Sequence, residues 1–472
     1  MKRKQYLVKN TALFALNSIG TKLINFFLVP VYTAALTTSD YGTADLVSTV
    51  AMILVPIFTL NVGEAVMRFC LDDNSDDKRI MSVGVTVMAF SVVLGILVIP
   101  IASLIPNIAH LRIYISLYCI SHGIYQISVC YLRGTERLAQ YALSNIVHVF
   151  SAATLNIVLL LGLKMGLKGY FTAHILGYFI GAVVAMTMGR IHRVLYEYKF
   201  DSILARNMIK YSIVLVPTSF MWWIMNSSDR IMVTAMVGAA ANGIYAISYK
   251  VPTVLSAMST VFNQAWSYSA IKEDKSEDRV SFNNRMFDKI FRLQIILTTG
   301  LLMVIKPFIA VYVSDAYYTS WRYTPYLLIG FFFMSMGTFL STSYTVNKDS
   351  KGFLKSGLSG AIMNVVLNWL FIPRIQTAGA ALATCISYIT VFLYRSIDTR
   401  KYLIIDMLKK EYIISVVLMF IMGVTVYLES ARGQILLVCE FILIVLINRQ
   451  FLIEMVTMIY GLIRKVLFKR AK

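Results

Sequence analysis

The chain has 472 residues, of which 58% are hydrophobic and 14% are charged, and its net charge is +20. Soluble domains carry about 25% charged residues, so this composition excludes an ordinary soluble fold and indicates a membrane protein. The basic excess lies mostly in short connectors, where it meets lipid headgroups, and it does not predict nucleic-acid binding.

Apolar runs of about 20 residues, the length that crosses a bilayer as a helix, recur from one end of the chain to the other. Barrel strands would be about ten residues long and alternating, so only helices fit this pattern. The sequence therefore predicts an all-α polytopic membrane protein of about fourteen transmembrane helices. The basic start precedes a segment too long and too interrupted by polar residues for a signal peptide, so we expect a retained first span. The predicted spans are residues 11–36, 43–69, 80–104, 109–132, 139–163, 168–190, 208–236, 242–270, 287–313, 323–346, 353–372, 376–397, 411–429 and 433–448.

The basic residues also predict the orientation of the chain. With the N-terminus in the cytoplasm, 34 of the 44 Lys and Arg residues fall on the cytoplasmic side and seven on the opposite side. Since cytoplasmic loops of membrane proteins are enriched in Lys and Arg, we expect both termini to be cytoplasmic. The other three basic residues, Lys22, Arg230 and Lys250, lie within predicted spans.

An internal repeat relates the two halves of the chain. Lys9 lies 33 residues before Gly42, and Lys210 lies 33 residues before Gly243, which gives an offset of 201 residues. The offset covers six spans, an even number, so the two halves are expected to insert with the same orientation. We therefore predict pseudo-symmetric six-helix bundles at residues 1–200 and 201–400. Residues 401–472 then form two extra transmembrane helices and a basic cytoplasmic tail.

Several stretches resemble a known family. They are DRIMV at 229–233, GAAANGIYAISYKVP at 238–252, LSGAIMNVVLNWLFIP from 358, GAALATCISY ending at 388, and the start KNTALFALNSIGTKLINFFLVPVYTAALTTSDYG. In this order they resemble the Wzx-like polysaccharide repeat-unit flippases of the multidrug/oligosaccharidyl-lipid/polysaccharide exporter superfamily.

The resemblance implies two bundles facing each other across a central cavity in the bacterial cytoplasmic (inner) membrane. It implies a transporter, not an enzyme, that moves undecaprenyl-pyrophosphate-linked oligosaccharides by alternating access for capsule or O-antigen synthesis. Expected partners are that lipid-linked sugar, membrane lipid, and the polysaccharide polymerase and glycosyltransferases of the pathway. Two alternatives share the fold: a lipid II flippase and a multidrug cation extruder. Lipid II flippases resemble this chain in keeping basic residues in the cavity.

The charges within the spans are the candidate substrate-binding residues, because a charge at the bilayer centre costs about 2.5–3.5 kcal/mol and normally faces a cavity or a partner. The planar guanidinium of Arg230 suits a phosphate, and Lys22 lies on a polar stripe with Asn25. Lys22 could instead snorkel to an interface, and Lys250 could be an interfacial anchor. The predicted substrate-binding residues are Lys22, Arg230, Lys250, Asn25, Asn226 and Tyr249.

The carboxylates within the spans, Asp45, Glu64 and Asp229, are candidates for coupling or for structural ion pairs. Glu64 can pair with Arg68 one turn away, and Asp229 with a basic residue on a neighbouring span. The sharper hypothesis is that one of them binds a sodium ion or a proton that drives transport. No nucleotide-binding GxxxxGK[ST] motif and no metal-ligand spacing occurs, so we expect no cofactor, no metal and no catalytic residue.

A polar aromatic group, Tyr118, His122, Tyr125 and Gln126, falls on one face of the fourth span. Such a face could contact sugars, or its members could satisfy one another between helices. The other histidines, His110, His148, His174 and His192, are dispersed in the sequence, and structural roles are expected for them.

Overall fold

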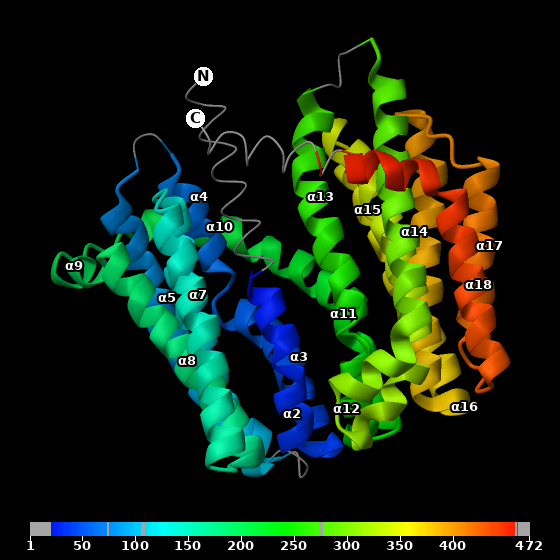
Figure 1. Cartoon of the computed structure of the whole chain (residues 1–472). Helices are drawn as coiled ribbons and strands as arrows, with labels where there is room; N and C mark the ends of the chain where they lie inside the picture. Colours follow the sequence, from blue (N-terminus) through cyan, green and yellow to red (C-terminus); the bar gives the residue numbers. More distant parts are fainter. Residues whose placement is uncertain (1–19, 73–74, 105–108, 273–276, 458–459, 461–472) are drawn as a thin grey trace, which may run out of the picture. The chain divides into compact units, whose positions relative to one another are not determined.

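The computed structural model of the protein describes residues 20–72, 75–104, 109–272, 277–457 and 460. Regular structure in this part of the chain is helical, without strands (Figure 1). Residues 20–27 and 449–457 form the first and last described helices. Between them lie α2 (Val29–Ala35), α3 (Thr38–Phe58), α4 (Val62–Cys70), α5 (Asp77–Ser103), η1 (Ala109–Leu111), α6 (Arg112–Gly134), α7 (Leu138–Asn156), η2 (Ile157–Gly162), α8 (Gly166–Gly189), α9 (Ile191–Tyr196), α10 (Ser202–Ile213), α11 (Leu215–Met236), α12 (Ala239–Ser248), α13 (Pro252–Lys272), α14 (Arg279–Tyr312), η3 (Asp315–Arg322), α15 (Thr324–Val346), α16 (Ser350–Asp398), η4 (Thr399–Lys401), α17 (Lys410–Thr425) and α18 (Ala431–Ile447).

From residue 20 onward the predicted spans correspond to these helices, but several are broken; residues 11–19 of the first predicted span lie outside the described part of the chain. Eight described helices are long and apolar enough to cross a membrane, and Ala431–Ile447 with Arg449–Thr457, bent by 67°, can count as a ninth. The second span divides into α3 and α4 at Leu60 and Asn61, whose φ angles of 49° and 52° are left-handed. The long α16 contains two predicted spans, joined at a kink at Gln376. The chain is therefore an all-α, multi-pass membrane protein, as predicted.

The chain folds into two compact units. The first comprises Met1–Ile247, Tyr312–Tyr318 and Asn368–Thr377, and the second comprises Ser248–Val311, Thr319–Leu367 and Ala378–Lys472. The division at 247/248 groups residues that contact one another. The expected bundles at 1–200 and 201–400 were instead predicted from the 201-residue offset between similar stretches of sequence, so the two divisions do not test each other. Those bundles therefore stay a prediction. The basic tail beyond residue 460 lies outside the described residues.

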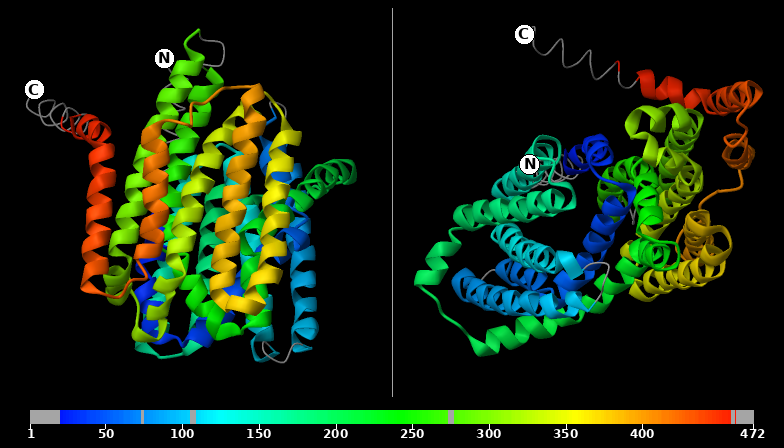
Figure 2. Two further views of the ribbon diagram at one scale, coloured as in Figure 1. Left: turned by 90° about the vertical axis from the view of Figure 1, so that its right-hand side faces the viewer. Right: turned by 90° about the horizontal axis from the view of Figure 1, so that it is seen from below.

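In the first unit, α6 packs against α4, α5 and α8, and α7 packs against α8. Buried apolar side chains such as Val66, Met81 and Ile127 fill the space among α4, α5 and α6. The connector helices α9 and α10 lie against this bundle (Figures 1 and 2). Met208 of α10 is fully buried. In the second unit, α13 packs on α15, which contacts α17, and α17 pairs with α18.

The first unit also contains a close helix crossing whose residues obey the repeat. A Cβ atom built on Gly42 of α3 would lie 1.8 Å from the backbone oxygen of Ala239, at the start of α12. A Cβ atom on Gly243 would lie 2.0 Å from the backbone oxygen of Thr38. Gly243 and Ala239 are the residues 201 positions after Gly42 and Thr38. The contact is thus reciprocal between repeat-related residues, as a pseudo-two-fold relation requires, and it needs glycine in both helices.

Candidate functional site

Directly beside the glycine crossing, α3 and α11 are joined by an ion pair. The Nη1 atom of Arg230 lies 2.6 Å from Oδ1 of Asp45, and the two side chains are 22% and 9% exposed. Asn242 on α12 donates from Nδ2 to the backbone oxygen of Gly42 at 2.9 Å and to Oδ2 of Asp45 at 3.4 Å. Because Gly42 carries no side chain, α12 comes close enough for Asn242 to reach both acceptors. The crossing therefore positions the carboxylate that holds Arg230.

A second carboxylate lies one residue before Arg230. Asp229 is 2% exposed, accepts a hydrogen bond from the hydroxyl of Tyr245 at 2.7 Å and caps the backbone N–H of Arg230 at 2.9 Å. Neighbouring residues on a helix point about 100° apart, so Asp229 and Arg230 reach different partners. The two candidate carboxylates Asp45 and Asp229 thus surround one backbone segment of α11 and contact α12 through Asn242 and Tyr245, respectively.

Arg230 needs an anionic partner in this arrangement. Removing one member of a buried ion pair leaves an uncompensated charge and costs about 3–5 kcal/mol, whereas neutralising both members is often tolerated. A carboxylate and a phosphate offer a guanidinium the same kind of acceptor, a pair of oxygens in a plane. The guanidinium of Arg230 is therefore chemically suited to either kind of oxyanion.

The remaining candidate residues are more scattered. Lys22 is half-buried and Asn25 is exposed on the first described helix, and no ion pair of Lys22 occurs within the described residues. Tyr249 and Lys250 belong to the second unit, where the hydroxyl of Tyr249 lies 3.5 Å from Oγ1 of Thr384. Asn226 lies on α11, but its side chain is outside the described part of the structure. Of the predicted set, the structure brings together Asp45, Asp229 and Arg230.

The expected pairing of Glu64 with Arg68 is wrong. Glu64 lies 4.0 Å from Arg133 of α6 and within 3.9 Å of the thiol of Cys130, while Arg68 pairs with Asp72 at 2.5 Å. Glu64 stands in the first turn of α4, which packs against α6, and Arg68 stands in its last turn beside the following loop. Because α4 begins only after the helix break at Asn61, Glu64 lies near α6 and Arg68 lies near the following loop. The spacing of Glu64 and Arg68 along a helix did not predict these partners.

Two of the histidines that are dispersed in the sequence, His148 and His174, lie near the polar aromatic group of the fourth predicted span. The ring of Tyr178 stacks on His122 at 4.5 Å and on His148 at 4.4 Å, so that it is sandwiched between two imidazoles. His148 also contacts Tyr125 at 4.7 Å, and the Tyr125 hydroxyl donates to Asn145. Three helices, α6, α7 and α8, supply these rings. Part of the polar face expected on the fourth span therefore makes contacts between helices, and one of its partners is a histidine of α7, His148.

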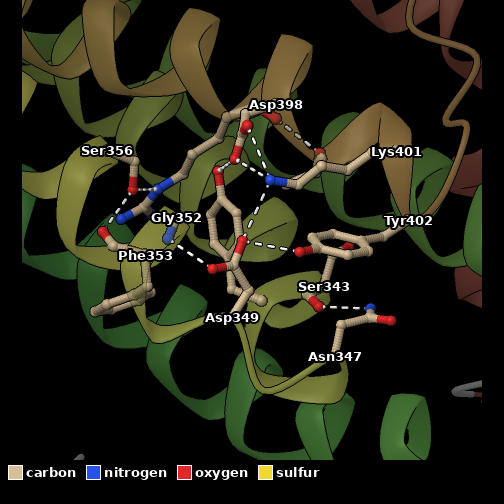
Figure 3. Close-up of polar contacts among 12 residues, drawn as sticks. Ser343, Asn347, Asp349, Gly352, Phe353, Ser356, Asp398, Lys401 and Tyr402 are labelled. Atoms are coloured by element: carbon tan, nitrogen blue, oxygen red, sulfur yellow. Dashed lines mark hydrogen bonds and ion pairs between the residues drawn. The ribbon is translucent and has the colours of Figure 1, made fainter.

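The second unit contains a polar network that the sequence did not single out (Figure 3). Arg395 is 2% exposed; its Nε donates to Oγ of Ser356 at 3.0 Å and its Nη1 to the backbone oxygen of Gly337 at 3.0 Å. No carboxylate pairs with it among the described residues. In η4, directly after the end of the same helix, Lys401 bridges Asp398 at 3.0 Å and Asp349 at 3.2 Å.

Asp349, the residue directly before α16, is the hub of this network. It accepts hydrogen bonds from the backbone N–H of Gly352 at 2.9 Å and from the hydroxyl of Tyr402 at 2.8 Å (Figure 3). These hydrogen bonds, the backbone one first, lower the pKa of the Asp349 carboxyl to about 2. The Gly352 bond caps the start of α16, whereas the Tyr402 bond and the Lys401 contact join that start to the segment directly after the end of α16. The network therefore fastens a helix hairpin.

Metal binding finds no support in the described residues, where no group of three or more His, Cys, Asp and Glu side chains could hold an ion.

The chain is similar to several known proteins. A family model described as "Polysaccharide biosynthesis protein" matches residues 7–268, and one described as "Lipid II flippase MurJ" matches residues 272–447. A search of curated proteins found no match. A solved structure of the lipid II flippase MurJ in an inward closed conformation is 13% identical, with a TM-score of 0.69 over 94% of this chain and 100% of that one.

Two further solved structures share the fold. An inward-facing multidrug resistance MATE family transporter of the MOP superfamily is 12% identical, with a TM-score of 0.64 over 82% of this chain and 97% of that one. A MOP superfamily transporter from Pyrococcus furiosus is also 12% identical, with a TM-score of 0.57 over 84% of this chain and 96% of that one. Identities this low show a common fold alone, and the fold is that of the predicted exporter superfamily.

Proposed function

Because this chain belongs to the polysaccharide biosynthesis protein family, we propose that it is a flippase for undecaprenyl-pyrophosphate-linked oligosaccharide repeat units. It moves them across the bacterial cytoplasmic membrane by alternating access, for cell-surface polysaccharides such as capsule or O-antigen. Both termini face the cytoplasm, and the polymerase and glycosyltransferases of the pathway act on the same lipid-linked sugar. One observation carries the proposal: Arg230, at membrane depth, is held by an exchangeable oxyanion, Asp45, at 2.6 Å.

In this proposal the pyrophosphate takes the place of Asp45. Without substrate, Asp45 neutralises Arg230 and keeps the guanidinium oriented, with Asn242 supporting the carboxylate. A pyrophosphate carries more charge than one carboxylate and can accept both parallel N–H groups of the guanidinium. Arg230 leaves Asp45 and binds the pyrophosphate of the substrate, so the guanidinium keeps an anionic partner during the exchange.

The other predicted residues complete the substrate path. Lys22 and Lys250 supply positive charge for the headgroup, and Asn25, Asn226 and Tyr249 supply hydrogen bonds to sugar or phosphate oxygens. Asp45, Glu64 and Asp229 remain the carboxylate candidates for coupling to a sodium ion or a proton. Glu64 has a structural alternative, because it lies near Arg133.

The lipid II flippase is the strongest alternative, because the match to the MurJ family model over residues 272–447 favours it. Both substrates carry a polyprenyl pyrophosphate, so the same Arg230 would serve either one. Loss of the gene separates them: the lipid-linked sugar that accumulates in the inner leaflet identifies the substrate. A multidrug cation extruder is disfavoured by the three basic residues at membrane depth, Lys22, Arg230 and Lys250. Export of a fluorescent cationic dye would support it.

The test of the Arg230 assignment must avoid a folding defect. The single change Arg230→Ala leaves Asp45 without its cation, so we use the neutral pair Asp45→Asn with Arg230→Gln, which removes both charges together and keeps a polar side chain at each position. In proteoliposomes containing the lipid-linked oligosaccharide, we expect this variant to fold and to lose transport by about 10- to 100-fold, the value of a hydrogen-bonded charge.

The matched control is the exposed pair Arg68 and Asp72, changed to Gln and Asn in the same way. It should transport at the normal rate. Wild-type transport by the Asp45→Asn/Arg230→Gln variant would show that Arg230 does not hold the pyrophosphate. Lys22→Gln and Lys250→Gln, which remove the charge and leave a shorter polar side chain, test the two lysines separately.

A further inference from the structure

A small cavity lies within the second unit, between α13, the start of α14, the end of α15 and residues 403–405. Its volume is about 20 Å³. One water needs about 10–15 Å³ by the same measure, so the cavity suits a single small group and not a sugar ring. Its other lining side chains are apolar, and the polar ones are Trp266, Arg279, Asn283, Thr342, Ser343 and Asn347.

The indole of Trp266 is the group in this cavity that lacks a partner. Trp266 is 4% exposed, and its ring stacks on Phe339 at 4.8 Å and contacts Phe282 at 5.7 Å. Its polar atom Nε1 is buried and forms no hydrogen bond with another described residue. An indole N–H can only donate, and buried polar atoms are normally satisfied, so the site calls for an acceptor.

The other polar lining groups also favour an acceptor that carries negative charge. Arg279 is the one charged side chain among the described residues that line the cavity, and its Nη2 donates to the backbone oxygen of Tyr402. Asn283, one turn further along α14, is 7% exposed and donates to the backbone oxygen of Arg279 at 2.7 Å. The end of α15 adds the hydroxyl and amide groups of Thr342, Ser343 and Asn347, of which the last two are drawn in Figure 3.

The acidic residues near the cavity lie outside its lining and have basic partners of their own. Asp278, directly before Arg279, pairs with Arg285 at 3.3 Å. Asp349 and Asp398 both pair with Lys401. The lining therefore combines a guanidinium, a donor-only indole and neutral hydroxyl and amide groups. A phosphate group matches this set, because its oxygens accept several hydrogen bonds at once and suit a guanidinium.

We propose that this cavity binds one phosphate group, which comes from an anionic phospholipid of the surrounding membrane or from inorganic phosphate in solution. The phosphate oxygens accept hydrogen bonds from Trp266, Arg279 and Thr342, which lie on three different helices. The bound group thus joins α13, α14 and α15 and stabilises the second unit. Arg230 belongs to the first unit, so this site is separate from the proposed substrate site and does not depend on the exported lipid.

Inorganic phosphate is tested on the purified full-length protein in detergent. The unfolding midpoint is measured against phosphate concentration, with chloride at equal ionic strength to account for screening. If the free ion is the ligand, phosphate raises the midpoint of the wild type. Trp266→Phe, which keeps the stacked ring, should then need about 3- to 10-fold more phosphate for the same rise. Arg279→Gln should need about 10- to 100-fold more, because it loses a charged donor.

A phospholipid is tested by native mass spectrometry of delipidated protein to which phosphatidylglycerol is added. If the lipid headgroup is the ligand, the wild type should retain one phosphatidylglycerol more than the double variant Trp266→Phe/Arg279→Gln. Arg279→Lys keeps the charge without the planar guanidinium, and it should bind more weakly than the wild type but better than Arg279→Gln. The response of the wild type to the two probes therefore identifies the source of the phosphate.

Two matched variants control for the loss of a buried indole and of an arginine. Trp321→Phe changes a tryptophan that is 3% exposed, and Arg285→Gln changes an exposed arginine on α14; neither residue lines the cavity. Both should respond to phosphate and to phosphatidylglycerol as the wild type does. A wild type that responds to neither probe would overturn the proposal and leave a water as the partner of the indole. Equal binding by the wild type and the double variant would also overturn it.

Discussion

Arg230 and Arg395 are both arginines inside apolar helices, but their surroundings differ in kind. Arg230 is 22% exposed and paired with a carboxylate, Asp45, on another helix. Arg395 is 2% exposed and bound to a hydroxyl and a backbone carbonyl, with its guanidinium 5.4 Å from the Phe353 ring. An ionic partner on an accessible side chain can be exchanged for a substrate, whereas neutral acceptors sealed in the protein can only hold the helix pair. Burial and the type of partner therefore separate a binding arginine from a structural one.

The largest effect is expected for breaking the ion pair from one side. Arg230→Gln leaves Asp45 buried without its cation, so the free energy of unfolding in detergent should fall by about 3–5 kcal/mol. Adding Asp45→Asn should restore most of this loss, because the buried charge is then removed as well. A denaturant titration of the two single variants and the double variant measures the coupling. Additive losses would mean that the pair does not act as a unit.

Arg395→Met should have a smaller effect of a different kind. It removes the donor to Ser356 and Gly337 while keeping an apolar stem, so we expect a loss of about 1–3 kcal/mol. A second substitution at an Asp or Glu residue should not restore the lost stability, because no carboxylate pairs with Arg395 among the described residues. The transport rate per folded molecule should equal that of the wild type. A transport defect in well-folded Arg395→Met protein would contradict the structural role assigned to Arg395.

A still smaller, pH-dependent effect is expected at Asp349. Its folded-state pKa is lowered to about 2, so its charged form stabilises the fold above about pH 4 and this contribution is lost as the pH falls toward 2. Asp349→Asn keeps a side-chain oxygen that can cap α16 and removes only the charge. The unfolding midpoints of wild type and variant should therefore differ at neutral pH and converge in acid. A constant difference would assign the effect to hydrogen bonding alone.

The helices were predictable because hydropathy and segment length act locally along the chain. The break at Leu60 and Asn61 was not, because neither residue is glycine or proline; only Pro56, which removes a helical hydrogen bond one turn earlier, signals it. The charged residues of the candidate site were singled out from their predicted depth in the membrane alone. Their partners were not, since Asp45 and Arg230 are 185 residues apart and meet through the glycine crossing. The histidine cluster was missed for the same reason: its members come from separate helices.

The smallest effect is expected at Arg68, which forms an exposed ion pair that can be compared with the more buried pair of Arg230. Arg68 pairs with Asp72 at 2.5 Å, a distance like that of the Arg230 pair, but both side chains are more than half exposed. Water and salt screen such a pair, and each ion is well solvated alone. Arg68→Gln should therefore leave the unfolding midpoint and the transport rate unchanged, with or without Asp72→Asn. If Arg68→Gln destabilised the protein as Arg230→Gln does, distance and not burial would govern the strength of these pairs, and the exchangeable character assigned to Arg230 would lose its physical basis.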